Sequence, residues 1–248
     1  VGKTHFPIHR SMSDNEKQIR RRSSQSEVDR FLRKVASAPP SGGAGGGRLI
    51  FALDATASRE PTWDQATHIQ AEMFEETRSL GGLEIQLVYY RGFREFEASP
   101  WCNQPQTLLP RMTRVSCVAG QTQIGRVLQH SLDETRKKKI NALVFVGDCM
   151  EEDPDLLARL AGELGLLAVP AFFFHEGMDP VAEKNFRHMA RLSGGAYCRF
   201  DSRSAKQLRD LLNAVAVYAA GGRKALESHS RRKGGIALQL THQLGKES

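Results

Sequence analysis

Short apolar runs alternate with amphipathic segments along the chain from residue 48 onward. The runs are continuously apolar and are bounded by glycine or polar residues, which is typical of strands buried on both faces of a parallel sheet. The predicted strands are Arg48–Leu53, Leu83–Tyr90, Phe93–Ala98, Asn141–Gly147, Leu167–Phe174 and Ala196–Phe200.

The segments between these runs carry apolar residues at three- and four-residue spacing, which predicts helices. The clearest is Ile124–Lys137, where Ile124, Val127, Leu128 and Leu132 share one face. The other predicted helices are Glu27–Ala36, Pro61–Ser79, Gln106–Thr113, Asp153–Glu163, Pro180–Ser193 and Ser204–Ala219. Alternating strands and helices imply right-handed crossovers. We therefore predict an α/β fold with three layers, in which a mostly parallel central sheet has helices on both faces.

A glycine-rich stretch, Pro39–Gly47, precedes the first predicted strand. A phosphate-binding glycine loop would need a strand before it and a helix after it, so we interpret this stretch as a linker. The predicted division is a basic, flexible arm and linker at residues 1–47, one domain at residues 48–220 and a basic tail at residues 221–248.

The composition is that of a soluble globular protein, with 40% hydrophobic and 25% charged residues in 248. No apolar stretch is long enough to span a membrane, and the N-terminal residues do not resemble a secretion signal. The four cysteines are widely scattered and form no C-x-x-C pair. We therefore predict reduced thiols and a cytoplasmic location, with a Cys102–Cys117 bridge as the less favoured alternative.

The net charge of +7 is concentrated in the arm, in the tail and in Arg136–Lys139 at the end of a predicted helix. Basic ends can bind nucleic acid electrostatically, but no aromatic residues are interleaved with these basic ones. A solvated surface is the interpretation we favour, and nucleic acid remains the weaker alternative.

Hydroxyl and carboxylate side chains follow the ends of predicted strands. Asp54, Thr56 and Ser58 alternate after the first strand, Thr122 precedes the helix at Ile124, and Asp148 follows Gly147. Because parallel strands end at one edge of a sheet, these side chains are expected to lie together.

Oxygen donors with few carboxylates suit Mg²⁺ or Mn²⁺. Turn formation and helix capping also explain such residues, and we favour that explanation for Thr122 and Ser58 taken singly. Helix capping can explain why one aspartate, Asp54 or Asp148, follows a strand. It does not explain why an aspartate stands at the end of both strands.

These residues resemble the D-x-S-x-S…T…D metal-ion-dependent adhesion site (MIDAS) of von Willebrand factor A (VWA) domains, a Rossmann-like family. The resemblance covers about residues 48–220 and is closest to bacterial intracellular members. It implies direct ligation by Thr56 and Ser58, ligation by Thr122 in at least one state, and contacts from Asp54 and Asp148 largely through water.

Two departures from the family pattern concern the same loops. Thr56 stands where serine is usual and keeps the hydroxyl. Cys149 stands where glycine is common, which we expect to alter the geometry of its loop.

The resemblance implies a protein-interaction module whose cation binds an Asp or Glu side chain of a partner protein, as in adaptors of ATPase or chaperone-like systems. A metal-dependent phosphohydrolase with Asp54 as nucleophile is the alternative. It is less favoured, because haloacid-dehalogenase-like enzymes carry a second aspartate where Thr56 stands. We therefore predict a binding module rather than an enzyme.

Three further features have two interpretations each. His175, after a predicted strand, could line the metal site, but we favour a polar surface position. Trp101 could be a partner contact or a packing anchor. The acidic residues between Asp148 and Asp155 could bind a second cation, but a solvated helix start is favoured.

Overall fold

The computed structural model describes residues 30, 31, 33–35, 46–56, 64, 66, 68, 73, 75, 82–200 and 205–233. Its centre is a six-stranded sheet in the order β3-β2-β1-β4-β5-β6. β3 runs antiparallel to β2, and the other pairings are parallel. The strands are β1 (Gly47–Asp54), β2 (Leu83–Arg91), β3 (Glu95–Ala98), β4 (Ala142–Gly147), β5 (Ala171–Glu176) and β6 (Tyr197–Phe200). The predicted mostly parallel sheet is confirmed.

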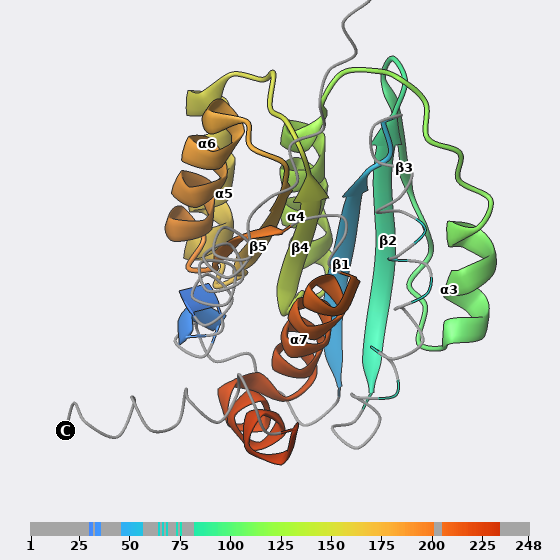
Figure 1. Ribbon diagram of the computed structural model, residues 1–248, viewed down its shortest axis with the longest axis vertical. Coiled ribbons are helices and arrows are strands. Elements are labelled where there is room, and N and C mark those ends of the chain that lie inside the picture. The colour runs from blue at the N-terminus through green and yellow to red at the C-terminus, as the bar shows by residue number, and fades with distance from the viewer. Residues whose placement is uncertain are drawn as a thin grey trace, which may run out of the picture.

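Helices cover both faces of this sheet (Figure 1). α7 packs on one face, and α4, α5 and α6 pack on the other. The described helices are α3 (Pro105–Met112), α4 (Ile124–Lys137), α5 (Pro154–Leu166), α6 (Pro180–Leu192) and α7 (Ala205–Lys233). The predicted helices at 27–36 and 61–79 lie largely outside the described residues, and the residues described within them are helical.

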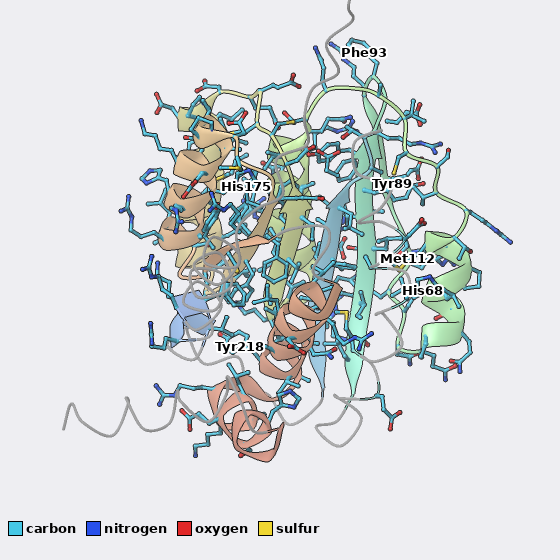
Figure 2. All side chains as sticks on the ribbon, in the orientation of Figure 1. His68, Tyr89, Phe93, Met112, His175 and Tyr218 are labelled. Atoms are coloured by element: carbon cyan, nitrogen blue, oxygen red, sulfur yellow. The ribbon has the colours of Figure 1, made fainter. Side chains whose placement is uncertain are left out.

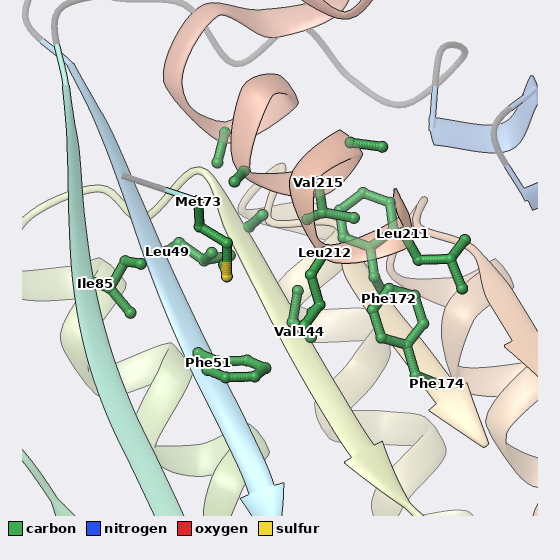
Figure 3. Packing of buried hydrophobic residues seen from close by; sticks show 14 of the residues in the cluster. Leu49, Phe51, Met73, Ile85, Val144, Phe172, Phe174, Leu211, Leu212 and Val215 are labelled. Carbon is green, nitrogen blue, oxygen red and sulfur yellow. The ribbon is translucent and has the colours of Figure 1, made fainter. Parts of the chain in front are cut away.

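The core has two halves because successive side chains of a strand point to opposite faces. In β1, Leu49 and Phe51 face α7, whereas Ile50 faces the helices on the other side. Figure 3 shows the α7 half, where Leu212 and Val215 lie over the sheet. Continuous apolar strands are therefore explained by burial on both faces.

The predicted arm contributes to this core. Phe31 and Val35 are fully buried, and the Phe31 ring lies 5.1 Å from that of Phe174 and 5.9 Å from that of Phe172. A division at residue 47 therefore places two core side chains outside the domain that they pack against.

Several element ends differ from the predictions. α5 continues to Leu166 and closes with a bond from the Val169 amide to the Leu164 carbonyl, so β5 starts at Ala171 instead of Leu167. α7 continues past Ala219 to Lys233, across a kink at Gly222. An apolar run is compatible with a helix end or a strand, and only the hydrogen bonds distinguish them.

Gly47 belongs to β1 rather than to the linker. A Cβ atom at this position would lie 2.2 Å from the carbonyl oxygen of Ala219 in α7. Glycine therefore permits the close approach of α7 to the start of the sheet.

Other sequence interpretations are resolved by side-chain contacts. Trp101 is a packing anchor: its Nε1 donates to Glu134 Oε2 at 2.9 Å, and the Arg48 guanidinium lies 3.7 Å from the ring centroid.

The four cysteines are free thiols, as predicted. Within the described part of the chain, no helix combines the length and apolar character needed to cross a membrane.

Candidate metal centre

The strand order reverses between β1 and β4. From β1 the sheet continues on one side to β2 and β3, and from β4 on the other side to β5 and β6. Such a reversal opens a crevice beyond the carboxyl ends of the two strands. Asp54 is the last residue of β1, and Asp148 directly follows β4, so both carboxylates lie at this reversal.

Asp54 is held rigidly. Its side chain is buried, Oδ1 accepts from the Thr56 amide at 2.8 Å, and Oδ2 accepts from the Tyr90 hydroxyl at 3.1 Å. Burial and the Asp54 carboxylate raise the pKa of Tyr90 well above its ordinary value, so its hydroxyl remains a donor. The bond from Thr56 turns the chain immediately after β1 and places the threonine beside the crevice.

Asp148 and Cys149 lie next to Asp54. One carboxylate oxygen of each aspartate and the Cys149 sulfur all lie within 4.8 Å of one another. Burial, followed by the charge of Asp148 and a hydrogen bond with it, raises the pKa of Cys149 to about 12. The negative potential that disfavours a thiolate here also attracts a cation.

Thr122 reaches this edge on a loop held by two neighbours. Its amide donates to Glu151 Oε2 at 3.2 Å, and its hydroxyl accepts from the Glu151 amide at 3.1 Å. On the other side of the loop, the Gln121 amide donates to the Gly92 carbonyl at 3.3 Å. Thr122 is therefore positioned from the turn after β2 and from the loop after β4, and does not cap α4 with its side chain.

The acidic residues after β4 have structural contacts. Glu152 accepts from the Ile124 and Gly125 amides at the start of α4, the latter at 2.8 Å. Asp153 caps α5 by accepting from the Asp155 amide at 2.9 Å. Asp153 fits the favoured prediction of a solvated helix start. Glu151 is also exposed, and it and Glu152 have a further role that was not predicted, because they hold the Thr122 loop and the start of α4.

His175 is fully buried, so the favoured surface position is wrong. It lies at the end of β5 near α6 (Figure 2), and burial lowers its pKa. Nε2 lies 3.1 Å from the Asp148 carbonyl, which only accepts, and Nδ1 lies 2.9 Å from the Tyr197 hydroxyl. In the neutral ring, Nε2 therefore donates to Asp148 and Nδ1 accepts from Tyr197. This pair fixes the backbone that carries Asp148.

The structure thus places four of the five predicted site residues, Asp54, Thr56, Thr122 and Asp148, at one edge of the sheet. Ser58 lies outside the described residues. The contacts of Tyr90 and Glu151 were not predicted, and a place beside the metal site was only the less favoured alternative for His175. His175 was visible as a polar residue ending an apolar strand, but the sequence offered no signal for the other two.

These residues fit a divalent cation. Two carboxylates would balance its charge, and the thiol lies beside them as a further kind of donor. Thr56 and Thr122, on the adjoining loops, carry hydroxyls that would supply neutral oxygens. The buried partners Tyr90 and His175 orient the loops that carry the donors, as surrounding hydrogen bonds do in protein metal sites.

Several solved structures share this fold. The SpRpn10 VWA domain has a TM-score of 0.51 and 15% identity, over 67% of this chain and 94% of that one. Proximal thread matrix protein 1 of the mussel byssus, with a zinc-occupied MIDAS motif, has a TM-score of 0.55 and 12% identity, over 70% of this chain and 46% of that one. The PilB minor pilin from Streptococcus sanguinis has a TM-score of 0.52 and 10% identity, over 72% and 62%.

No protein-family model and no curated protein sequence matches the chain. At these low identities the structural likeness concerns the fold. The chain has the VWA fold, as the sequence predicted.

Proposed function

We propose that this protein is a divalent-cation-dependent interaction module. Asp54, Thr56, Thr122 and Asp148, with Ser58 two residues after Thr56 in the sequence, would hold the cation at the strand reversal between β1 and β4. A partner protein would complete the coordination with an Asp or Glu side chain. The observation that carries the proposal is the convergence of the Asp54 and Asp148 carboxylates at the strand reversal.

The oxygen donors taken alone suit Mg²⁺ or Mn²⁺. The mussel protein, whose MIDAS motif is occupied by zinc, supports the view that this fold also accommodates other divalent cations. The cation would supply positive charge to an otherwise acidic edge, which is the requirement for binding a partner carboxylate there.

Exposed apolar side chains beside the crevice support a protein partner. Phe93, in the turn between β2 and β3, is 69% exposed (Figure 2) and follows Gly92, which is bonded to the Thr122 loop. Val118 is 40% exposed, and its amide donates to the Ala55 carbonyl at 3.0 Å. Exposed aromatic and aliphatic side chains supply the apolar area that protein interfaces bury at their core.

Hydrolysis with Asp54 as nucleophile has weaker support. Asp54 is 1% exposed, and its two oxygens already accept bonds from Thr56 and Tyr90. A nucleophilic carboxylate needs an oxygen directed at the substrate. We therefore retain the prediction of a binding module.

Nucleic-acid binding has little support in the described part of the chain. Arg136 pairs with Asp133 and Glu163, Lys138 pairs with Glu84, and the Lys139 ammonium donates to backbone carbonyls. Most of the arm and tail lies outside the described residues. An adaptor role in an ATPase or chaperone-like system, and a cytoplasmic location, remain proposals from the sequence.

Calorimetric titration of Mg²⁺ and Mn²⁺ tests the cation site. We expect one saturable equivalent in the wild type and none in Asp54→Ala/Asp148→Ala. Asp133→Ala/Asp155→Ala is the matched control, because it removes two exposed carboxylates outside the proposed ligand set and should retain binding. Loss of binding in both variants, with both folded, would point to general charge attraction instead of this site.

Acetate, the simplest carboxylate, then tests the open coordination position. Amide NMR signals of Thr122 and Glu151 should shift with acetate when the cation is present and not in EDTA. Equal shifts under both conditions, or none with the cation bound, would contradict carboxylate capture.

A further inference from the structure

We infer that Cys149 is a ligand of the cation at this edge, so that the site prefers a thiophilic cation of the zinc class to Mg²⁺. This inference rests on the proposed function, because it names the kind of cation that the same site takes. In the sequence, Cys149 was noted only because it stands where the VWA family commonly has glycine. The structure places its sulfur beside the carboxylate oxygens of Asp54 and Asp148.

The positions of three donor atoms support ligation. The Cys149 sulfur and one oxygen each of Asp54 and Asp148 lie within 4.8 Å of one another. Donors at about 2.0–2.3 Å from one tetrahedral zinc ion lie about 3.3–3.8 Å apart, so the three side chains need to close by at most about 1–1.5 Å to form a bound set. This is the one such group of three donors among the residues that the structure describes.

The surroundings of Cys149 differ from those of the buried cysteines. Cys102 and Cys198 are 4% and 1% exposed and pack in the hydrophobic cluster under α7, as free cysteines commonly do. Cys149 is half-buried against two carboxylates, and its thiol is hydrogen-bonded to Asp148. A thiol in that position contributes little to apolar packing and is suitably placed to coordinate a cation.

A sulfur donor changes which cation the site selects. Thiolates favour zinc, cobalt and cadmium ions, whereas Mg²⁺ prefers an all-oxygen shell. Binding breaks the S–H bond, forms a metal–sulfur bond and releases the proton to the buffer, without any redox change. In this inference Asp54, Asp148 and Cys149 ligate directly, and the hydroxyls of Thr56, Ser58 and Thr122 act outside the first coordination shell. A fourth tetrahedral position is then left for a partner carboxylate.

Cobalt(II) is the probe, because its absorption reports sulfur ligation directly. We would titrate Co²⁺ into the full chain under a thiol-free reductant and record the near-ultraviolet sulfur-to-cobalt charge-transfer band with the visible d–d bands. The band should appear in the wild type and in Cys117→Ser, a control that removes another partly buried thiol. It should be absent from Cys149→Ser and from Asp54→Ala/Asp148→Ala.

Competition then measures selectivity. Zn²⁺ should displace Co²⁺ from the wild type and excess Mg²⁺ should not, while Cys149→Ser should lose Zn²⁺ affinity by at least about tenfold. Wild-type d–d bands without the charge-transfer band would overturn the inference and leave the proposed function intact. A band that persists in Cys149→Ser would also overturn it. No cobalt signal together with no Mg²⁺ or Mn²⁺ heat would contradict the proposed function as well.

Discussion

Thr122 and Glu151 form a reciprocal pair of hydrogen bonds between two loops that are distant in sequence. The Thr122 amide donates to the Glu151 carboxylate, and the Glu151 amide donates to the Thr122 hydroxyl. One glutamate thus orients the hydroxyl of a proposed metal ligand and ties its loop to the strand end that carries Asp148.

Glu151→Ala should weaken cation binding by about tenfold, because it removes the carboxylate that accepts from the Thr122 amide. Calorimetric titration measures the effect. Asp155→Ala, which removes an exposed carboxylate nearby, is the matched control and should bind nearly as well as the wild type. Equal weakening in the two variants would mean that Glu151 acts only through its charge.

Gly120→Ala should disturb the same loop by a steric route. A Cβ atom at Gly120 would lie 1.9 Å from the carbonyl oxygen of Gly92, so the loop must move and take Thr122 with it. We expect weaker cation binding and a loss of about 1–3 kcal/mol in the free energy of unfolding, measured in urea.

Gly162→Ala provides the matched control for that substitution. Gly162 lies within α5, and a Cβ atom there would meet nothing within 4 Å. Alanine should raise the free energy of unfolding by about 0.5–1 kcal/mol, because it is the better helix former. If Gly120→Ala were equally benign, the close approach to Gly92 would not constrain the loop.

Phe31→Ala should lower the free energy of unfolding by about 3–5 kcal/mol, since its ring is fully buried against Phe172 and Phe174. Urea denaturation measures the change. A loss below about 1 kcal/mol would show that the predicted arm is dispensable for the core.

His130 should make stability depend on pH, since burial lowers its pKa while Nε2 donates to Gln86 Oε1 at 2.9 Å. Below the ordinary histidine pKa of about 6.5, the unfolded chain binds a proton that the folded chain resists. The stabilisation is therefore complete above about pH 6.5 and decreases as the pH falls towards the lowered value.

Comparison with His130→Gln isolates this contribution. Between about pH 7 and pH 5, the unfolding free energy of the variant should fall less steeply than that of the wild type. Parallel curves for the two proteins would refute the assignment, and an NMR titration of the His130 ring provides a direct check.

The sequence alone determined the order of strands and helices and the position of two aspartates at strand ends. Local periodicity carries that information: continuous apolar runs mark buried parallel strands, and three- and four-residue spacing marks helices such as Ile124–Lys137. The α/β class and the shared edge of Asp54 and Asp148 followed from it, whereas the VWA fold was predicted from the resemblance of Asp54, Thr56, Ser58, Thr122 and Asp148 to the MIDAS motif.

Only the tertiary structure decided which groups support that edge. Glu151 holds Thr122, His175 holds the Asp148 backbone, and the Cys149 sulfur approaches Asp54, each through contacts between segments far apart in sequence. The burial of Phe31 likewise depends on contacts with segments far away in the sequence. Periodicity describes which face of an element is apolar, whereas packing of the whole chain decides which neighbours meet that face.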